Sequence, residues 1–155
     1  MIPMHDSISF IDAAPDQYDQ FMIMMKEELD DYLEPSLEQV GLTWEEYGEV
    51  FRTVGDVCEI NFDGAAVGFY WIELRAHVLH IHALILKPEF QNKGIGGAVL
   101  NILDENFRDR AKTMELGVHE SNNGARALYE RRGFKAVRKL DDIGFIIMQK
   151  PTSGA

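Results

Sequence analysis

The chain has 155 residues, of which 46% are hydrophobic, and it carries a formal net charge of −11. This size and apolar fraction are typical of one globular domain and exclude a disordered chain. The acidity argues against nucleic-acid binding, which needs a basic surface. No apolar run reaches the roughly 18 residues of a membrane span, and residues 1–6 do not resemble a secretory signal. We therefore expect a cytoplasmic protein that does not bind membranes.

The negative charge is concentrated in the N-terminal part. Residues 1–62 contain 15 acidic side chains against only Lys26 and Arg52, a net charge of −13, whereas the remaining residues carry +2. This distribution is compatible with electrostatic attraction of a cationic substrate. For most of these carboxylates we favour the alternative, a solvated surface that keeps the protein soluble.

The first 55 residues predict one strand and two helices. Residues 7–11 are expected to form the strand. Large apolar side chains recur at helical spacing over residues 15–33, which predicts one amphipathic helix that is broken by Pro35. The sequence Thr43-Trp-Glu-Glu46 is a capping box and predicts a second helix that ends near Gly55.

Two strands are expected next, at residues 57–62 and 65–75, joined by the tight-turn pair Asp63-Gly64. The only cysteine, Cys58, lies in the first of these strands, so an internal disulfide is excluded. Its apolar surroundings favour a core thiol over a nucleophile.

The most informative stretch runs from residue 78 to residue 98. An apolar run at residues 78–86 predicts a mostly buried strand that stops near Pro88, and the glycine-rich segment Gln91–Gly97 opens a helix expected to reach about Ala111. Backbone amides at such a helix start point outward, and the helix dipole adds partial positive charge, so this place suits a phosphate. The alternative is a helix cap in which glycine permits tight packing.

The remaining residues predict three strands and a short helix. In chain order these are a strand at 114–118, a helix at 122–132 that ends at Gly133, a hairpin of residues 134–138 and 143–148, and a frayed tail at 151–155. Together the elements predict a single domain over residues 1–150. Its fold class is α/β, with a mixed, mostly antiparallel central sheet and helices on both faces.

Two motifs carry a resemblance to a known family. Gln91-Asn-Lys-Gly94-Ile-Gly96 follows the strand that ends before Pro88, and Asn122-Asn-Gly-Ala125-Arg-Ala-Leu128-Tyr129 precedes Gly133-Phe134. In this order and spacing, over about residues 60–150, they resemble the acetyl-CoA-binding motif and the Asn-x-x-Ala-x-x-Leu-Tyr motif of the GCN5-related N-acetyltransferase (GNAT) superfamily. The resemblance implies the GNAT acyl-CoA N-acyltransferase fold, with the cofactor in a splay between the fourth and fifth strands. It also implies acetyl-CoA as cosubstrate, and homodimers are common in the family.

The resemblance assigns the cofactor contacts. Backbone amides of the glycine-rich loop would cradle the pyrophosphate, and backbone groups at the end of the fourth strand would pair with pantetheine. The expected cofactor-binding residues are Leu84, Ile85, Leu86, Gln91, Asn92, Lys93, Gly94, Ile95, Gly96, Gly97, Asn122, Ala125 and Tyr129. For Asn122 the alternative is an N-cap of its own helix, and the two roles are compatible.

Tyr129 is the expected proton donor to the departing thiolate, a role implied by the Leu-Tyr of the second motif. A phenol with a pKa of about 10 stays protonated at neutral pH and can donate. The alternative is an aromatic side chain that packs against the sheet.

His80 and His82 are the expected candidates for the base that deprotonates the substrate ammonium, with His82 ahead because it is nearer the cofactor end. Strand side chains have a period of two, so both imidazoles project from one face, and imidazole suits proton transfer near pH 7. The pair also resembles the His-x-His of arylalkylamine N-acetyltransferases. The alternatives are packed histidines or a metal pair, for which no third ligand is evident, so no metal is expected. Glu73 and His119 are weaker candidates.

These residues predict an acetyl-CoA-dependent N-acetyltransferase that transfers its acetyl group directly to a primary amine in a ternary complex. No nucleophile with a partnered base is visible that would support a covalent intermediate. A small cationic amine is the expected acceptor. The alternatives are an N-terminal or lysine amine of a peptide or protein, and a non-catalytic acyl-CoA-binding regulatory module with the same fold.

Overall fold

The computed structural model describes residues 4–153, which form one seven-stranded sheet in the order β1-β2-β3-β4-β5-β7-β6. The strands are β1 (Ile8–Asp12), β2 (Asp56–Phe62), β3 (Ala65–Arg75), β4 (Val78–Leu86), β5 (Thr113–His119), β6 (Lys135–Leu140) and β7 (Phe145–Pro151). Only β4 and β5 are parallel, and all other neighbouring strands are antiparallel. The predicted mixed, mostly antiparallel sheet is therefore confirmed.

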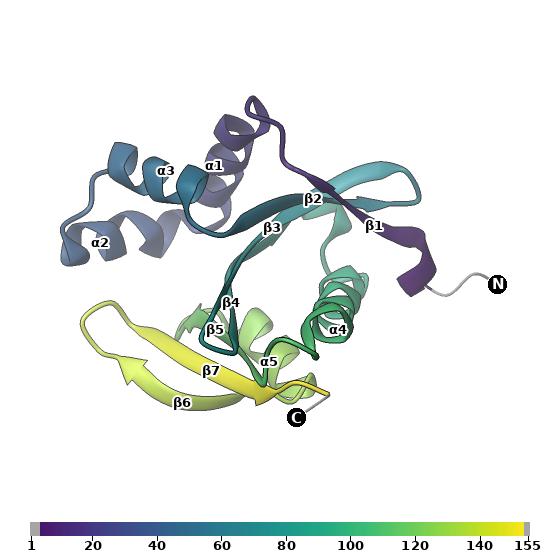
Figure 1. The fold of residues 1–155 in the computed structure, drawn as a ribbon. Helices are drawn as coiled ribbons and strands as arrows, with labels where there is room; N and C mark the ends of the chain where they lie inside the picture. Colours follow the sequence, from purple (N-terminus) through teal and green to yellow (C-terminus); the bar gives the residue numbers. More distant parts are fainter. Residues whose placement is uncertain (1–3, 154–155) are drawn as a thin grey trace.

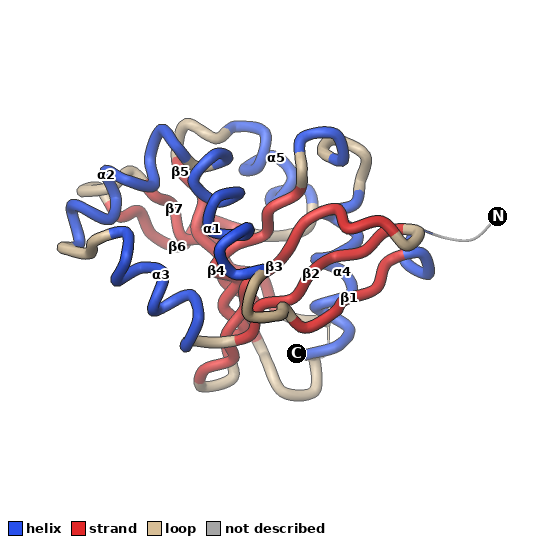
Figure 2. Tube along the Cα trace, turned by 90° about the horizontal axis from the view of Figure 1, so that it is seen from above, coloured by secondary structure: helices blue, strands red, loops and turns tan. Residues whose placement is uncertain are grey.

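Helices cover both faces of this sheet, as predicted. They are α1 (Gln17–Glu28), α2 (Asp30–Val40), α3 (Trp44–Thr53), α4 (Ile95–Phe107) and α5 (Asn123–Arg131), with short 3-10 turns at Met4–Ser7 and Pro88–Phe90. Figure 1 shows α1, α2 and α3 on one side of the curved sheet and α4 and α5 on the other, and Figure 2 shows the three N-terminal helices gathered together. Within residues 4–153, no helix has the length and apolar character needed to cross a membrane.

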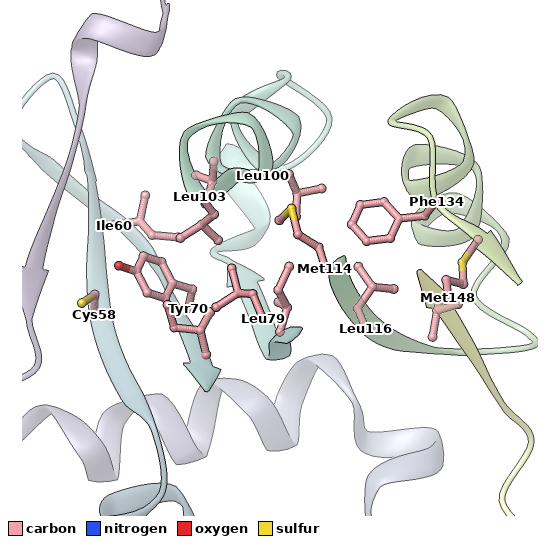
Figure 3. Packing of buried hydrophobic residues seen from close by; sticks show 14 of the residues in the cluster. Cys58, Ile60, Tyr70, Leu79, Leu100, Leu103, Met114, Leu116, Phe134 and Met148 are labelled. Carbon is pink, nitrogen blue, oxygen red and sulfur yellow. The ribbon is translucent and has the colours of Figure 1, made fainter. Parts of the chain in front are cut away.

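The two faces of the sheet bury two separate hydrophobic clusters. The cluster on the α4 and α5 side, part of which is drawn in Figure 3, contains Ile60, Leu79, Leu103, Met114 and Phe134. The cluster under the N-terminal helices contains Met25, Phe51, Phe69, Trp71 and Ile85. Burial of apolar area on both faces explains why β3 and β4 read as nearly continuous apolar runs.

A β-bulge in β4 changes the face to which its side chains point. Trp71 pairs with Ala83 and Ile72 pairs with Ile81, so His82 is the extra residue of the bulge. Before the bulge, Ile81 belongs to the cluster on the α4 side, and after it, Ala83 belongs to the cluster under the N-terminal helices. The bulge therefore allows one strand to serve both clusters without breaking its alternation elsewhere.

Residues 17–40 form two helices, so the prediction of one helix broken by Pro35 is wrong. The break lies at Leu29, which has φ −112° and ψ 19°, and Pro35 lies inside α2. The first four amides of any helix lack an intrahelical acceptor. Because α2 starts at Asp30, Pro35 lies only two residues after these four amides. Its missing N–H leaves the carbonyl of Asp31 without its helical partner.

The capping box that starts α3 is confirmed. The Glu46 amide donates to Thr43 Oγ1 at 3.1 Å, and the Thr43 amide donates to Glu46 Oε1 at 3.0 Å. By contrast, α4 ends at Phe107 rather than near Ala111. The amides of Arg110 and Ala111 both donate to the Phe107 carbonyl at 2.8 Å, which closes a turn toward β5.

The C-terminal segment is anchored, so the prediction of a frayed tail is wrong for its described part. The Thr152 side chain is buried, and its hydroxyl donates to the Ala111 carbonyl at 2.7 Å. The Ser153 amide donates to Asp104 Oδ1 at 2.8 Å. These polar residues bond to groups of α4 and the turn after it, a long-range pairing that composition does not reveal. Residues 154 and 155 lie outside the described part of the chain.

Candidate active site

The two parallel strands separate halfway along their length. β4 and β5 pair from Val78 and Thr113 to Ile81 and Leu116, whereas both strands continue well beyond these residues. A cleft of about 600 Å³ opens where they diverge. The bulge residue His82 lies just past the last pair, and a bulge locally increases strand twist, which favours the divergence. The splay implied by the family resemblance is thus present.

The cleft gathers nearly all the residues expected to bind the cofactor. Its lining includes Leu84, Ile85, Leu86, Gln91, Asn92, Gly94, Ile95, Gly96, Gly97, Asn122, Ala125 and Tyr129. Lys93 was expected with them, but it is not part of the lining. Segments from β4, α4 and α5 therefore meet at one surface, although they are separated in sequence.

The geometry of the glycine-rich loop leaves room for a ligand. Gly94 caps α4 with φ 86°, a conformation that glycine adopts without strain. A Cβ atom at Gly96 would meet only Leu128 at 3.7 Å and Leu86 at 3.9 Å, and both of these residues line the cleft. A larger side chain at position 96 would therefore project into the cleft. The free amides of the first turn and the open backbone edge of β4 fit a pyrophosphate followed by an amide-rich arm.

Two arginines at this end of the cleft were not anticipated from the sequence. Arg131 and Arg132 both line it, and a Cβ atom at Gly97 would overlap the Arg132 guanidinium. Their positive charge lies beside the positive end of the α4 dipole, where an anion gains from both. The signal that could have found them is the pair of consecutive arginines directly before Gly133.

Tyr129 reaches the cleft from α5. Its ring packs edge-on against Phe134, with centroids 5.9 Å apart, and burial raises the pKa of its hydroxyl to about 12. The phenol therefore stays protonated throughout the physiological range and can only donate or accept as a neutral group. Packing and proton donation are compatible here, because the partly buried ring packs against the core while the residue borders the cleft.

His82 and Glu73 form a pair rather than two competing bases. His82 Nε2 lies 2.8 Å from Glu73 Oε1, and Glu73 Oε2 lies 3.1 Å from Arg75 Nε. A carboxylate only accepts hydrogen bonds, so Nε2 of His82 carries the proton and Nδ1 is left as the free acceptor. The imidazole also packs on Trp71, with ring centroids 4.7 Å apart. His82 lines the cleft.

His80 projects on the same side as His82, but it is not part of the cleft lining. The two rings are nearly parallel, with centroids 6.2 Å apart, and His80 Nδ1 lies 3.3 Å from Glu115 Oε1. Burial, followed by the charge of Arg75, lowers the pKa of His80 below its usual value. His80 is therefore placed behind His82 as a neutral imidazole at neutral pH.

His119 and Asn122 contribute to one wall of the cleft together with Tyr32 of α2. The rings of Tyr32 and His119 stack at 4.5 Å with an interplanar angle of 3°, and Phe145 meets Tyr32 edge-on at 5.7 Å. Asn122 Nδ2 donates to the Tyr32 hydroxyl at 3.3 Å, while Asn122 Oδ1 caps α5 by accepting from the Ala125 amide at 3.2 Å. The sequence did not mark Tyr32 as a site residue, because it showed only the spacing of an amphipathic helix there.

Cys58 lies outside the cleft, in the hydrophobic core. It is buried, and burial raises the pKa of its thiol, which fits the core role expected for it. Across residues 4–153, no group of three or more His, Cys, Asp or Glu side chains is arranged to hold a metal ion.

Comparison with known protein families identifies the family of this chain. The profile described as the Acetyltransferase (GNAT) family matches residues 21–134, which include the glycine-rich loop, Tyr129 and the histidine pair. The chain belongs to the GNAT acetyltransferase family. The match also includes α2 and α3, the helices whose sequence alone was least diagnostic.

Similar proteins agree with membership of the GNAT family. An uncharacterized N-acetyltransferase of Methanocaldococcus jannaschii is 37% identical over 87 residues, which are 51% of this chain and 38% of that relative. The matched part is therefore well under half the length of the curated relative. It establishes a shared segment and not a shared substrate.

Solved structures show the GNAT fold over nearly the whole chain. A spermidine N-acetyltransferase from Vibrio cholerae, in complex with CoA and spermine, has a TM-score of 0.73 at 15% identity and covers 96% of this chain and 98% of that one. A ribosomal-protein alanine N-acetyltransferase from Escherichia coli has a TM-score of 0.68 at 19% identity and covers 96% of both chains. At these identities the likeness establishes the fold.

Proposed function

We propose that the protein is an acetyl-CoA-dependent N-acetyltransferase that acetylates a small primary amine by direct transfer. The observation that carries this proposal is the single cleft between β4 and β5, which joins the Gln91–Gly97 loop to His82 and Tyr129. A cofactor loop, a base candidate and an acid candidate therefore border one cavity. A module that only bound acyl-CoA would not need an acid and a base beside it.

Acetyl-CoA would supply the activated acetyl group. The α4 amides, Arg131 and Arg132 would hold its phosphates, and the β4 edge at Leu84–Leu86 would orient the arm that carries the thioester. Gln91 Nε2 already donates to the Leu86 carbonyl at 2.9 Å, so the arm would pair with the other backbone groups of this edge. This anchoring at two points would set the thioester near the point where the strands separate, close to His82. Such positioning of two reactants is itself a large source of rate enhancement.

His82 would accept the proton of the substrate ammonium, directly or through water. Glu73 would hold the ring through Nε2 and leave Nδ1 as the free acceptor, and it would stabilise the imidazolium once the proton has been taken. Glu73 would thus act through His82 and not as the base. His80 would extend the route to Glu115 behind it.

Tyr129 would protonate the departing sulfur. Its ring would be held by packing against Phe134, and the pKa of about 12 keeps the proton available at neutral pH. The substrate nitrogen loses two protons as it becomes an amide. His82 would take the first and later release it to solvent, and the second would leave the nitrogen as the intermediate collapses and return through water to the Tyr129 phenolate.

The experiment that tests this function is a thiol-release screen with acetyl-CoA. Polyamines, arylalkylamines, aminoglycosides, amino acids and short peptides with free N-terminal or lysine amines would be compared as acceptors. Turnover with at least one small amine above the rate of acetyl-CoA hydrolysis is expected. Turnover with peptides alone would favour the peptide or protein acceptor, and binding of acetyl-CoA without turnover on any acceptor would favour the non-catalytic module.

A further inference from the structure

The cleft carries opposite charges at its two ends. Arg131 and Arg132 border it at the end formed by the first turn of α4, whereas Glu28 of α1 borders it at the end formed by the N-terminal helices. The proposed function uses the positive end for the phosphates of the cosubstrate. Nothing in that function yet accounts for the negative end.

Glu28 occupies an electrostatically unfavourable position. It is the last residue of α1, where the helix dipole already contributes partial negative charge. Among the residues that the structure describes, Glu28 has no ion-pair partner. Lys26, the basic residue in the same turn, points its ammonium over the ring of Trp44 at 5.5 Å instead. A cation placed here would gain from both the carboxylate and the helix end.

The wall beside Glu28 suits a cation with an aliphatic chain. Tyr32, His119 and Phe145 form a contiguous aromatic surface that lines the same cleft. Aromatic faces attract ammonium groups and also bury methylene groups. Burial raises the pKa of the Tyr32 hydroxyl, the hydrogen bond with Asn122 lowers it, and the charges of Glu28 and Asp31 raise it further.

We infer that the acceptor is a diamine or polyamine, whose second ammonium group binds Glu28 beside the aromatic wall while the reacting amine lies at His82. This inference rests on the proposed function and names its substrate class. The two ammonium groups would be separated by the chain that lies along Tyr32 and Phe145. An amine with one charge would bind only at the reacting end, and an N-terminal peptide amine offers no cation at a fixed short distance.

The test compares acceptors that differ only in the second charge. Diaminobutane and diaminopentane are each assayed against the n-alkylamine of the same chain length, and kcat/KM is measured for wild type, Glu28→Gln and Glu27→Gln. Glu27 is the matched control, because it is an exposed carboxylate of the same turn that does not line the cleft. Calorimetric titration of the diamines into the CoA-saturated protein gives a second readout that does not depend on turnover.

The expected result is that wild type and Glu27→Gln prefer the diamine by about tenfold or more, the size of one hydrogen-bonded charge contact. In Glu28→Gln this preference should fall to near unity, with a matching loss of diamine affinity and a much smaller loss of kcat/KM on the monoamine. Equal loss on both acceptors, or a preference that survives Glu28→Gln, would overturn the inference while leaving the acetyltransferase function intact. Absence of turnover on every amine in the wild type would instead contradict the function, and the inference with it.

Discussion

Tyr129 and His82 approach the cleft from different elements, one from α5 and one from the bulge of β4. Sequence reasoning found both because each lies at a fixed offset from a motif. It could not find that Glu73 is the partner of His82, because the 2.8 Å contact depends on the register between β3 and β4 and on the bulge within it. Glu28, Tyr32 and Arg132 were missed for the same reason, since each has meaning only through neighbours distant in sequence.

Replacing Tyr129 with Phe should lower kcat by about 10²–10⁴-fold, the usual effect of losing a general acid. The ring that packs against Phe134 stays, so the fold and acetyl-CoA affinity should change little. Steady-state kinetics and a calorimetric titration with acetyl-CoA measure the two quantities. A variant with near-normal kcat on a good acceptor would show that Tyr129 only packs.

Replacing His82 with Gln should lower kcat by a similar factor of about 10²–10⁴. The rate of the wild type should fall on the acid side at a pH that stays fixed across acceptor amines of different pKa, and this fixed limb should vanish in the variant. Because Glu73 is proposed to act through His82, adding Glu73→Gln to His82→Gln should cost little more. The base lies elsewhere if His80→Gln, His82→Gln and the variant with both histidines replaced all keep the full rate. They would also have to keep the same fall of the rate on the acid side.

His80 should make the protein less stable in mild acid. Burial lowers its folded-state pKa, with Arg75, Glu115, His82 and Glu73 as the charged or titratable groups that face it. The unfolded chain therefore binds more protons, so stability is full above the unfolded pKa of about 6.5 and is lost as the pH falls from there toward the folded pKa. Urea unfolding at several pH values should show that the free energy of unfolding falls less in acid for His80→Gln than for the wild type. An identical fall in both proteins would contradict this assignment.

At the scale of elements, the sequence predicted what local rules determine. Strand β4 begins at Val78 and ends at Leu86 as expected, because an apolar run followed by proline sets both ends. The capping box of α3 is equally local. The break at Leu29 and the anchoring of Thr152 depend instead on packing between α1 and α2 and on bonds to the segment after α4, so no window of sequence predicts them.

Asp104 should be the main anchor of the C-terminal segment. It is buried, lies 3.3 Å from Lys150 Nζ, and accepts hydrogen bonds from the amide and hydroxyl of Ser153 at 2.8 and 3.1 Å. Asp104→Ala leaves these donors without an acceptor and should lower the free energy of unfolding by about 3 kcal/mol. Urea denaturation measures this value. The exposed Asp109→Ala serves as control and should stay within about 0.5 kcal/mol of wild type, and an equal effect of both changes would exclude the anchor.

At the scale of the whole molecule, the division of charge follows the division of the cleft. The acidic N-terminal part supplies the helices at the end proposed for the acceptor, and the C-terminal part supplies α5 and its arginines at the end proposed for the cofactor. The total charge and the motif order were readable from the sequence. The meeting of the two parts across the β4–β5 splay was implied by the family resemblance and is explicit only in the structure.

The proposed function requires acetyl-CoA to bind in the β4–β5 cleft over the Gly94–Gly97 turn. The most direct measurement is calorimetric titration of acetyl-CoA into wild type, Gly96→Val and Asn101→Val. Both variants place valine in α4, but position 96 borders the cleft and Asn101 is exposed outside it. Valine has a higher helix propensity than glycine, and a Cβ at position 96 meets only ordinary contacts, so the variant should fold. We predict saturable binding to wild type and Asn101→Val and none to Gly96→Val. Unchanged affinity in a folded Gly96→Val protein would contradict the account.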